Sequence, residues 1–142
     1  MRFLFLLALL ALPHQYPYYP DPVLTPGTVI RGIDTKTTCH NGYARLARHV
    51  SKHLKTEVMK RYKLDPATQH LYEIDHFIPL NIGGTNDITN LWPEPLASAH
   101  DKDKVEFFLY QEVCHSRMQI EDAQDQIKTD WVKVFNTLPA HK

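Results

Sequence analysis

The sequence has few cysteines and no long apolar segment. Only two cysteines, Cys39 and Cys114, occur among the 142 residues, so the closely spaced cysteine pairs of a structural zinc site are absent. The longest apolar run, Phe3 to Leu12, spans ten residues, whereas a membrane-spanning helix needs about 20. These absences argue against a cysteine-rich zinc module and against a permanent transmembrane anchor.

Net charge is also absent, because 16 basic side chains balance 16 acidic ones. The sum hides a local excess. Seven Lys or Arg residues lie between Arg45 and Lys63, with Glu57 as the only acid. A cationic segment of this kind is compatible with binding to a phosphate backbone, and a solvated helix face gives the same count. The length and the ordinary 43% hydrophobic content predict one globular domain without repeats.

The N-terminus has the plan of a secretory signal peptide, with Arg2 ahead of the apolar run. We expect this signal in residues 1–14 and a secreted or periplasmic protein. No clean small-x-small cleavage site precedes Pro13, so retention without cleavage and a buried apolar N-terminal element remain alternatives. Proline has a fixed φ and no N–H, and its repetition after the signal predicts an extended proline-rich arm over residues 15–38.

The redox state of the two cysteines depends on that location. Disulfides persist outside the reducing cytosol, so an exported chain is expected to pair Cys39 with Cys114. Two separate buried thiols are the alternative for a chain that stays in the cytosol.

Hydrophobic periodicity and one capping signal together predict three helices. Apolar residues recur every four positions between Asn41 and Tyr62, which indicates one helix with basic residues on its other faces. Ser98 and Asp101 form a candidate capping box for a second helix that ends near Cys114. A third helix carries a core-facing stripe, formed by Ile120, Ala123, Ile127, Trp131 and Val134.

Two short strands, over residues 70–75 and 90–92, are predicted on either side of a turn at Gly83 and Gly84. Together with the helices they predict an α+β fold. Trp92, in the second strand, could stack on a nucleobase, although packing in the core is the favoured interpretation.

Chemically useful residues gather at the end of the first strand. Hydrolysis of a phosphodiester needs a base for water and a cation for the developing charge. Successive side chains of a strand point to opposite sides, so Asp75 could hold a metal ion while His76 points at the attacking water. An isolated Asp-His pair is also compatible with ordinary surface residues.

A longer pattern resembles the HNH endonuclease family. It consists of Asp-His-Phe-Ile-Pro-Leu from Asp75, the Gly-Gly turn, and Asn-Leu-Trp-Pro from Asn90 before a helix. The resemblance implies a ββα-metal unit within a nuclease domain over residues 39–142, packed with flanking helices. It implies that His76 is the general base, that Asp75 binds metal, and that Asn90 orders the base-bearing loop or binds metal. A wider likeness to small exported members also implies the Cys39–Cys114 disulfide.

The third metal ligand is less well marked. The helix histidine of the family would fall at His100, with Asp103 as a substitute from the same turn, and Lys104 stands where a second histidine would follow. Carboxylate and amide oxygens favour one Mg²⁺ or Mn²⁺ ion, whereas His100 would favour Zn²⁺ or Ni²⁺. Solvent exposure without any metal role is the alternative for His100.

These features predict a metal-dependent endonuclease that cuts DNA or RNA with little sequence preference, since nothing resembles a base-reading module. The candidate phosphate contacts are five basic residues: Arg45, Arg48, Lys52, Lys102 and Lys104. The alternative is a non-catalytic module on a degenerate HNH scaffold that binds nucleic acid or an envelope partner. His76 discriminates between the two, because a binding module has no need of a base.

Overall fold

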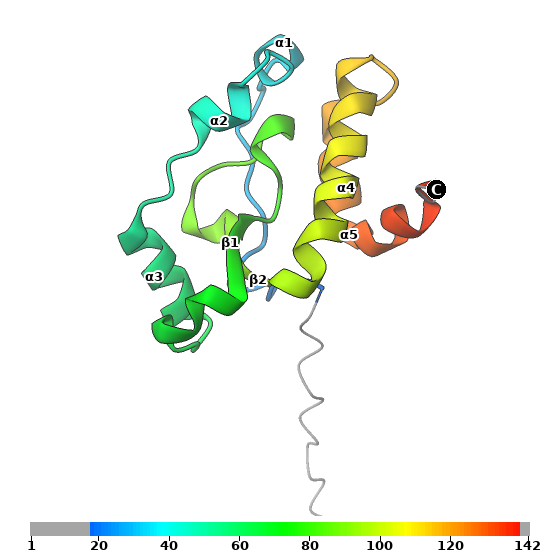
Figure 1. The fold of residues 1–142 in the computed structure, drawn as a ribbon. Helices are drawn as coiled ribbons and strands as arrows, with labels where there is room; N and C mark the ends of the chain where they lie inside the picture. The colour runs from blue at the N-terminus through cyan, green and yellow to red at the C-terminus, as the bar shows by residue number, and fades with distance from the viewer. Residues whose placement is uncertain (1–17, 140–142) are drawn as a thin grey trace, which may run out of the picture.

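The computed structural model describes residues 18–139, so the expected signal peptide lies outside the described residues. The predicted α+β class is confirmed: a two-stranded antiparallel sheet is surrounded by helices (Figure 1). No helix within the described range is long and apolar enough to cross a membrane.

The sheet is a hairpin of β1 (Tyr72–His76) and β2 (Leu91–Pro95), with Tyr72 opposite Pro95 and His76 opposite Leu91. It lies between α3 (Lys52–Arg61) on one side and α4 (Leu96–Cys114) and α5 (Ile120–Thr137) on the other (Figure 1). Ile74 and Leu91 pack with residues of α3, whereas Trp92 packs with residues of α4 and α5. Because both faces of the hairpin are covered, its residues do not alternate between buried and exposed, which explains the weak strand pattern in the sequence.

The two C-terminal helices, α4 (Leu96–Cys114) and α5 (Ile120–Thr137), pack against each other. The predicted core stripe of α5 is confirmed, since Ile120, Ala123, Ile127 and Trp131 are all buried. The predicted capping box of α4 is wrong. Pro95 occupies the N-cap position, and Ser98 lies inside the helix with its hydroxyl donating to the Pro95 carbonyl.

The single helix predicted from Asn41 to Tyr62 is also wrong, because the chain forms two helices there. They are α2 (Tyr43–Ala47) and α3 (Lys52–Arg61), separated by extended backbone at Arg48 and Ser51. The side chain of Asn86 binds the backbone in this gap, and Ser51 caps α3 by accepting from the Leu54 N–H at 3.1 Å. Tertiary hydrogen bonds therefore interrupt a continuous apolar pattern.

The described part of the arm packs along the body. The Thr25 hydroxyl donates to the Leu91 carbonyl, and Trp131 Nε1 donates to the Tyr18 carbonyl. The arm ends in the short helix α1 (Thr35–Thr38), where the expectation was extended chain. Three 3₁₀ helices complete the fold, η1 (Pro66–Leu71), η2 (Leu80–Ile82) and η3 (Ile88–Asn90).

The predicted disulfide is confirmed. It joins Cys39, just after α1, to Cys114, the last residue of α4, with a Cα–Cα distance of 5.6 Å. The arm is thereby linked covalently to the helix that follows the hairpin. A disulfide is in keeping with an oxidising compartment.

Candidate functional site

His76 ends β1 and is 1% exposed. Its Nε2 atom lies 3.0 Å from Asn86 Oδ1, whereas its buried Nδ1 atom has no hydrogen-bond partner among residues 18–139. Burial lowers the pKa of His76, and the positive charge of Arg48 lowers it further. The hydrogen bond to Asn86 and the negative charge of Asp75 raise it, but they do not outweigh the burial. The ring is therefore neutral near pH 7, which is the form that can accept a proton.

Asn86 connects His76 to the gap between α2 and α3. Its Nδ2 atom donates to the Ala47 carbonyl at 2.8 Å, and its Oδ1 atom accepts from the His49 backbone N–H at 3.0 Å. Arg48 lies between these two anchor points and is exposed. The two bonds fix the backbone on either side of Arg48, whose charge lowers the pKa of His76.

Asn90 organises the loop between the strands. The side chain is fully buried; its Oδ1 accepts from the Ile78 N–H, while its Nδ2 donates to the carbonyls of Ile78 and Thr85. Asn90 therefore orders the loop that follows the predicted base. Its predicted role as a metal ligand is not supported, because its buried amide group is already committed to the backbone.

The two positions of the Gly-Gly turn require glycine for different reasons. Gly83 has a φ of +88°, a conformation that side chains disfavour. At Gly84 a Cβ atom would lie 1.8 Å from the Ile78 carbonyl oxygen, so no side chain fits. The predicted turn is confirmed, and it keeps the loop tightly closed around Asn90.

Asp75 is held by a buried lysine. Lys102, from α4, is 0% exposed; its Nζ donates to Asp75 Oδ2 at 2.7 Å, to the His76 carbonyl at 3.0 Å, and to Glu106. These contacts use all three protons of the ammonium group. The predicted contact between Lys102 and nucleic acid is therefore wrong, because this lysine is an internal counter-ion.

Two further carboxyl groups complete this cluster, which we call the Lys102 cluster (Asp75, Glu94, Lys102, Glu106). Burial raises the pKa of Glu94 to about 9 and that of Glu106 to about 7, partly offset in each case by Lys102. Lys102 lowers the pKa of Asp75 in spite of burial. Near neutral pH, Asp75 is ionised opposite Lys102, whereas Glu94 keeps its proton.

The three predicted metal donors do not converge. His100 is exposed and lines a surface pocket with Lys104 and Phe107. Two residues along an α-helix correspond to a rotation of about 200°, so His100 lies on the face of α4 opposite Lys102 and Asp75. Within the described chain, no three His, Cys, Asp or Glu side chains form a group that could hold a metal ion. The predicted set of Asp75, Asn90 and His100 therefore does not fit a bound ion in this conformation.

The other predicted phosphate contacts lie at the surface. Arg45, Arg48 and Lys52 are exposed along α2 and the start of α3. Lys104 is partly exposed, pairs with Asp101 at 3.2 Å, and lies 5.4 Å from the Phe135 ring centroid. Of the five basic residues, Arg45, Arg48 and Lys52 are the exposed ones, and Arg48 lies in the chain between the two residues that Asn86 binds.

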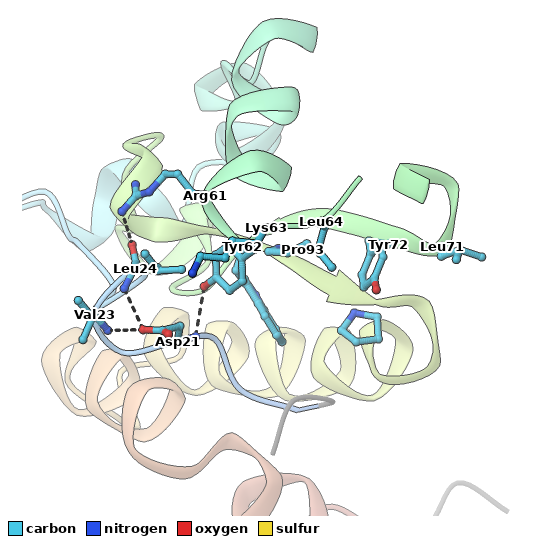
Figure 2. Close-up of a pocket in the computed structure, with 12 residues that line it drawn as sticks. Asp21, Val23, Leu24, Arg61, Tyr62, Lys63, Leu64, Leu71, Tyr72 and Pro93 are labelled. Atoms are coloured by element: carbon cyan, nitrogen blue, oxygen red, sulfur yellow. Dashed lines mark hydrogen bonds between the residues drawn. The ribbon is translucent and has the colours of Figure 1, made fainter. Parts of the chain in front are cut away.

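A pocket of about 710 Å³ lies at the other end of the hairpin (Figure 2). Tyr72 and Pro95, which pair at the start of β1 and the end of β2, line it together with the end of α3 and with Asp21, Val23 and Leu24. Arg61, which also lines the pocket, donates to the Leu24 carbonyl at 2.9 Å (Figure 2). Trp92 also borders the pocket but is 1% exposed, which agrees with core packing rather than an open stacking surface.

Sequence reasoning missed Asn86 and Glu94. Asn86 contacts residues 37 and 39 positions earlier in the chain, and no local pattern marks such contacts. Glu94 stands beside prolines in a strand, where an acid ordinarily signals an exposed position. No protein-family model, no curated protein sequence and no solved structure matches the chain.

Proposed function

We propose that the protein is a nuclease of the HNH type, which hydrolyses phosphodiester bonds of DNA or RNA. The observation that carries the proposal is the neutral His76 at the end of a strand, with the exposed Arg48 nearby and an Nδ1 atom that has no hydrogen-bond partner among residues 18–139. The succession of β1, a loop ordered by Asn90, β2 and α4 supports a ββα unit around this histidine.

In the proposed reaction, His76 Nδ1 accepts a proton from water while the water oxygen bonds to phosphorus. The bond from phosphorus to the leaving oxygen breaks, and that oxygen takes a proton from solvent. Arg48 provides positive charge for the phosphate. Because His76 is 1% exposed, substrate reaches Nδ1 only after a local movement, and catalytic hydrogen bonds commonly form only in the substrate complex.

A divalent metal ion would supply a second positive charge at the phosphate, as the HNH resemblance implies. Asp75 is the predicted donor beside His76, but Lys102 already binds its Oδ2 atom. We therefore route no step through a metal ion and treat metal dependence as an experimental variable, with Mg²⁺, Mn²⁺, Zn²⁺ and Ni²⁺ compared.

Phosphate contacts from Arg45, Arg48 and Lys52 would give affinity with little sequence preference. The Cys39–Cys114 disulfide supports a secreted or periplasmic location. The second candidate function is a non-catalytic module that binds nucleic acid or an envelope partner. The enclosure of His76 and the pairing of Asp75 with Lys102 favour this candidate, since neither group is open to substrate in the described conformation.

The test is cleavage of plasmid DNA and RNA by the disulfide-bonded full chain with each metal ion and with chelator. His76→Ala is compared with His70→Ala, a matched control because His70 is exposed and its Nδ1 contacts the carbonyl of the nearby Ala67. We expect His76→Ala to lower the cleavage rate by about 10² to 10⁴ and His70→Ala to leave it unchanged. Salt-sensitive binding without cleavage under any condition would establish the binding module instead.

A further inference from the structure

The amide group of Asn86 has a defined orientation. A backbone N–H, from His49, points at one of its ends, and a backbone carbonyl, from Ala47, accepts from the other. A carbonyl oxygen can only accept and an N–H can only donate. The oxygen of the Asn86 amide is therefore the atom that faces His76, at 3.0 Å from Nε2.

This orientation determines where the ring proton of His76 lies. A neutral imidazole has one N–H and one lone pair. Because Asn86 Oδ1 cannot donate, the 3.0 Å contact is a hydrogen bond only when Nε2 carries the proton. The lone pair is then on Nδ1, the atom without a hydrogen-bond partner in the described chain.

We propose that Asn86 is a positioning residue, which holds His76 in the Nε2–H tautomer and thereby makes Nδ1 the proton-accepting atom. The inference deepens the proposed nuclease function and rests on it for its catalytic meaning. The reverse tautomer would place two lone pairs against each other at 3.0 Å and would leave no lone pair on Nδ1 to receive a proton.

The break between α2 and α3 makes this placement of Asn86 possible. If residues 41–62 formed one continuous helix, the His49 N–H and the Ala47 carbonyl would bond within that helix. The break frees both groups for Asn86 and holds Arg48 between them. His76 is also influenced by Asp75 on its own strand and by Lys102 from α4, but neither is placed by the structure at Nε2.

The tautomer can be measured directly. In ¹⁵N NMR spectra of the full chain at a pH where His76 is neutral, a protonated ring nitrogen and a bare one have well separated chemical shifts. We expect Nε2 to be the protonated atom. A spectrum with the proton on Nδ1 overturns the proposal without any variant.

Three variants separate positioning from simple tethering of the loop. Asn86→Ala removes the acceptor, so we expect a mixed tautomer and a fall in kcat of about 10- to 100-fold, as for other partners that orient a functional histidine. Asn86→Asp keeps an oxygen acceptor while losing the bond to Ala47, and we expect it to retain the Nε2–H tautomer and most of the kcat. Asp87→Ala, at the exposed neighbouring position, should change neither.

The outcomes distinguish the two proposals. If Asn86→Ala keeps the Nε2–H tautomer with unchanged kcat, or if Asn86→Asp behaves like Asn86→Ala, the positioning role is wrong. Absence of cleavage by the unmodified protein overturns the nuclease proposal, whereas the tautomer is read from the spectrum and does not depend on cleavage.

Discussion

The basic side chains of two regions of the molecule differ completely in placement. In the segment of α2 and α3, Arg45, Arg48 and Lys52 are exposed. On α4, Lys102 is 0% exposed and surrounded by the carboxyl groups of Asp75 and Glu106. The exposed basic side chains of the first region are therefore available to a binding partner, whereas Lys102 is paired inside the protein.

The difference follows from helix geometry. Lys102 falls on the same face of α4 as the buried Ser98, Val105 and Leu109, whereas Lys104 is rotated away from it by about 200°. A buried ammonium group is tolerated only with full hydrogen bonding and opposite charge. Lys102 meets that requirement, because it pairs with the ionised Asp75 and donates to the His76 carbonyl and to Glu106.

The largest expected effect comes from removing the internal counter-ion. Lys102→Met leaves ionised Asp75 without its partner, so we expect the free energy of unfolding to fall by about 3–5 kcal/mol. The measurement is urea unfolding near neutral pH. Lys104→Met is the matched control on the same helix, with an expected change within about 0.5 kcal/mol. Equal effects from the two substitutions would contradict the role of Lys102 as an internal counter-ion.

Glu94 gives a smaller effect that depends on pH. Its pKa is about 9 in the folded protein, against an ordinary value of 4.5, so between these values the folded state binds more protons than the unfolded state. The contribution of Glu94 to stability is therefore most favourable below this window and falls as the pH rises through it, by at most about 1.4 kcal/mol per pH unit.

Glu94→Gln mimics the protonated side chain and removes this term. We expect urea unfolding at a series of pH values to show a shallower loss of stability between pH 6 and 8.5 than in the unmodified protein. Glu106, with a pKa raised to about 7, contributes in both proteins. Glu121→Gln, at an exposed position of α5, should leave the pH dependence unchanged. Parallel curves for Glu94→Gln and the unmodified protein would show that Glu94 is ionised in the interior.

The same contrast explains what the sequence could predict. The hairpin, the disulfide and the stripe of α5 follow from turn residues, the inferred export and apolar periodicity, all of which are visible in the sequence. The break between α2 and α3 and the role of Asn86 were missed together. They are one tertiary interaction, in which a distant amide takes hydrogen bonds that an isolated helix would keep.

Lys102 and His100 were misassigned for a related reason. The resemblance favours His100 as a ligand by its order in the chain, but the helix begins at Leu96 and its rotation turns His100 away from Asp75. The buried face of α4 is mostly apolar and carries Lys102 within it. A lysine in such a stripe is a usable signal of an internal ion pair when an acid follows four residues later, as Glu106 does.

The smallest effect on stability and the clearest effect on binding should come from the exposed region. Changing Arg45, Arg48 and Lys52 together to Gln should alter the free energy of unfolding little, because these side chains are exposed. If each contacts one phosphate, the slope of log Kd against log salt concentration for duplex DNA falls by up to about 3. The measurement is binding to a labelled duplex across a salt series, with Lys128→Gln and Lys133→Gln on exposed positions of α5 as the control. An unchanged slope would mean that α2 and α3 carry a solvated basic face without a nucleic-acid role, and the search for a phosphate contact would move to Lys104.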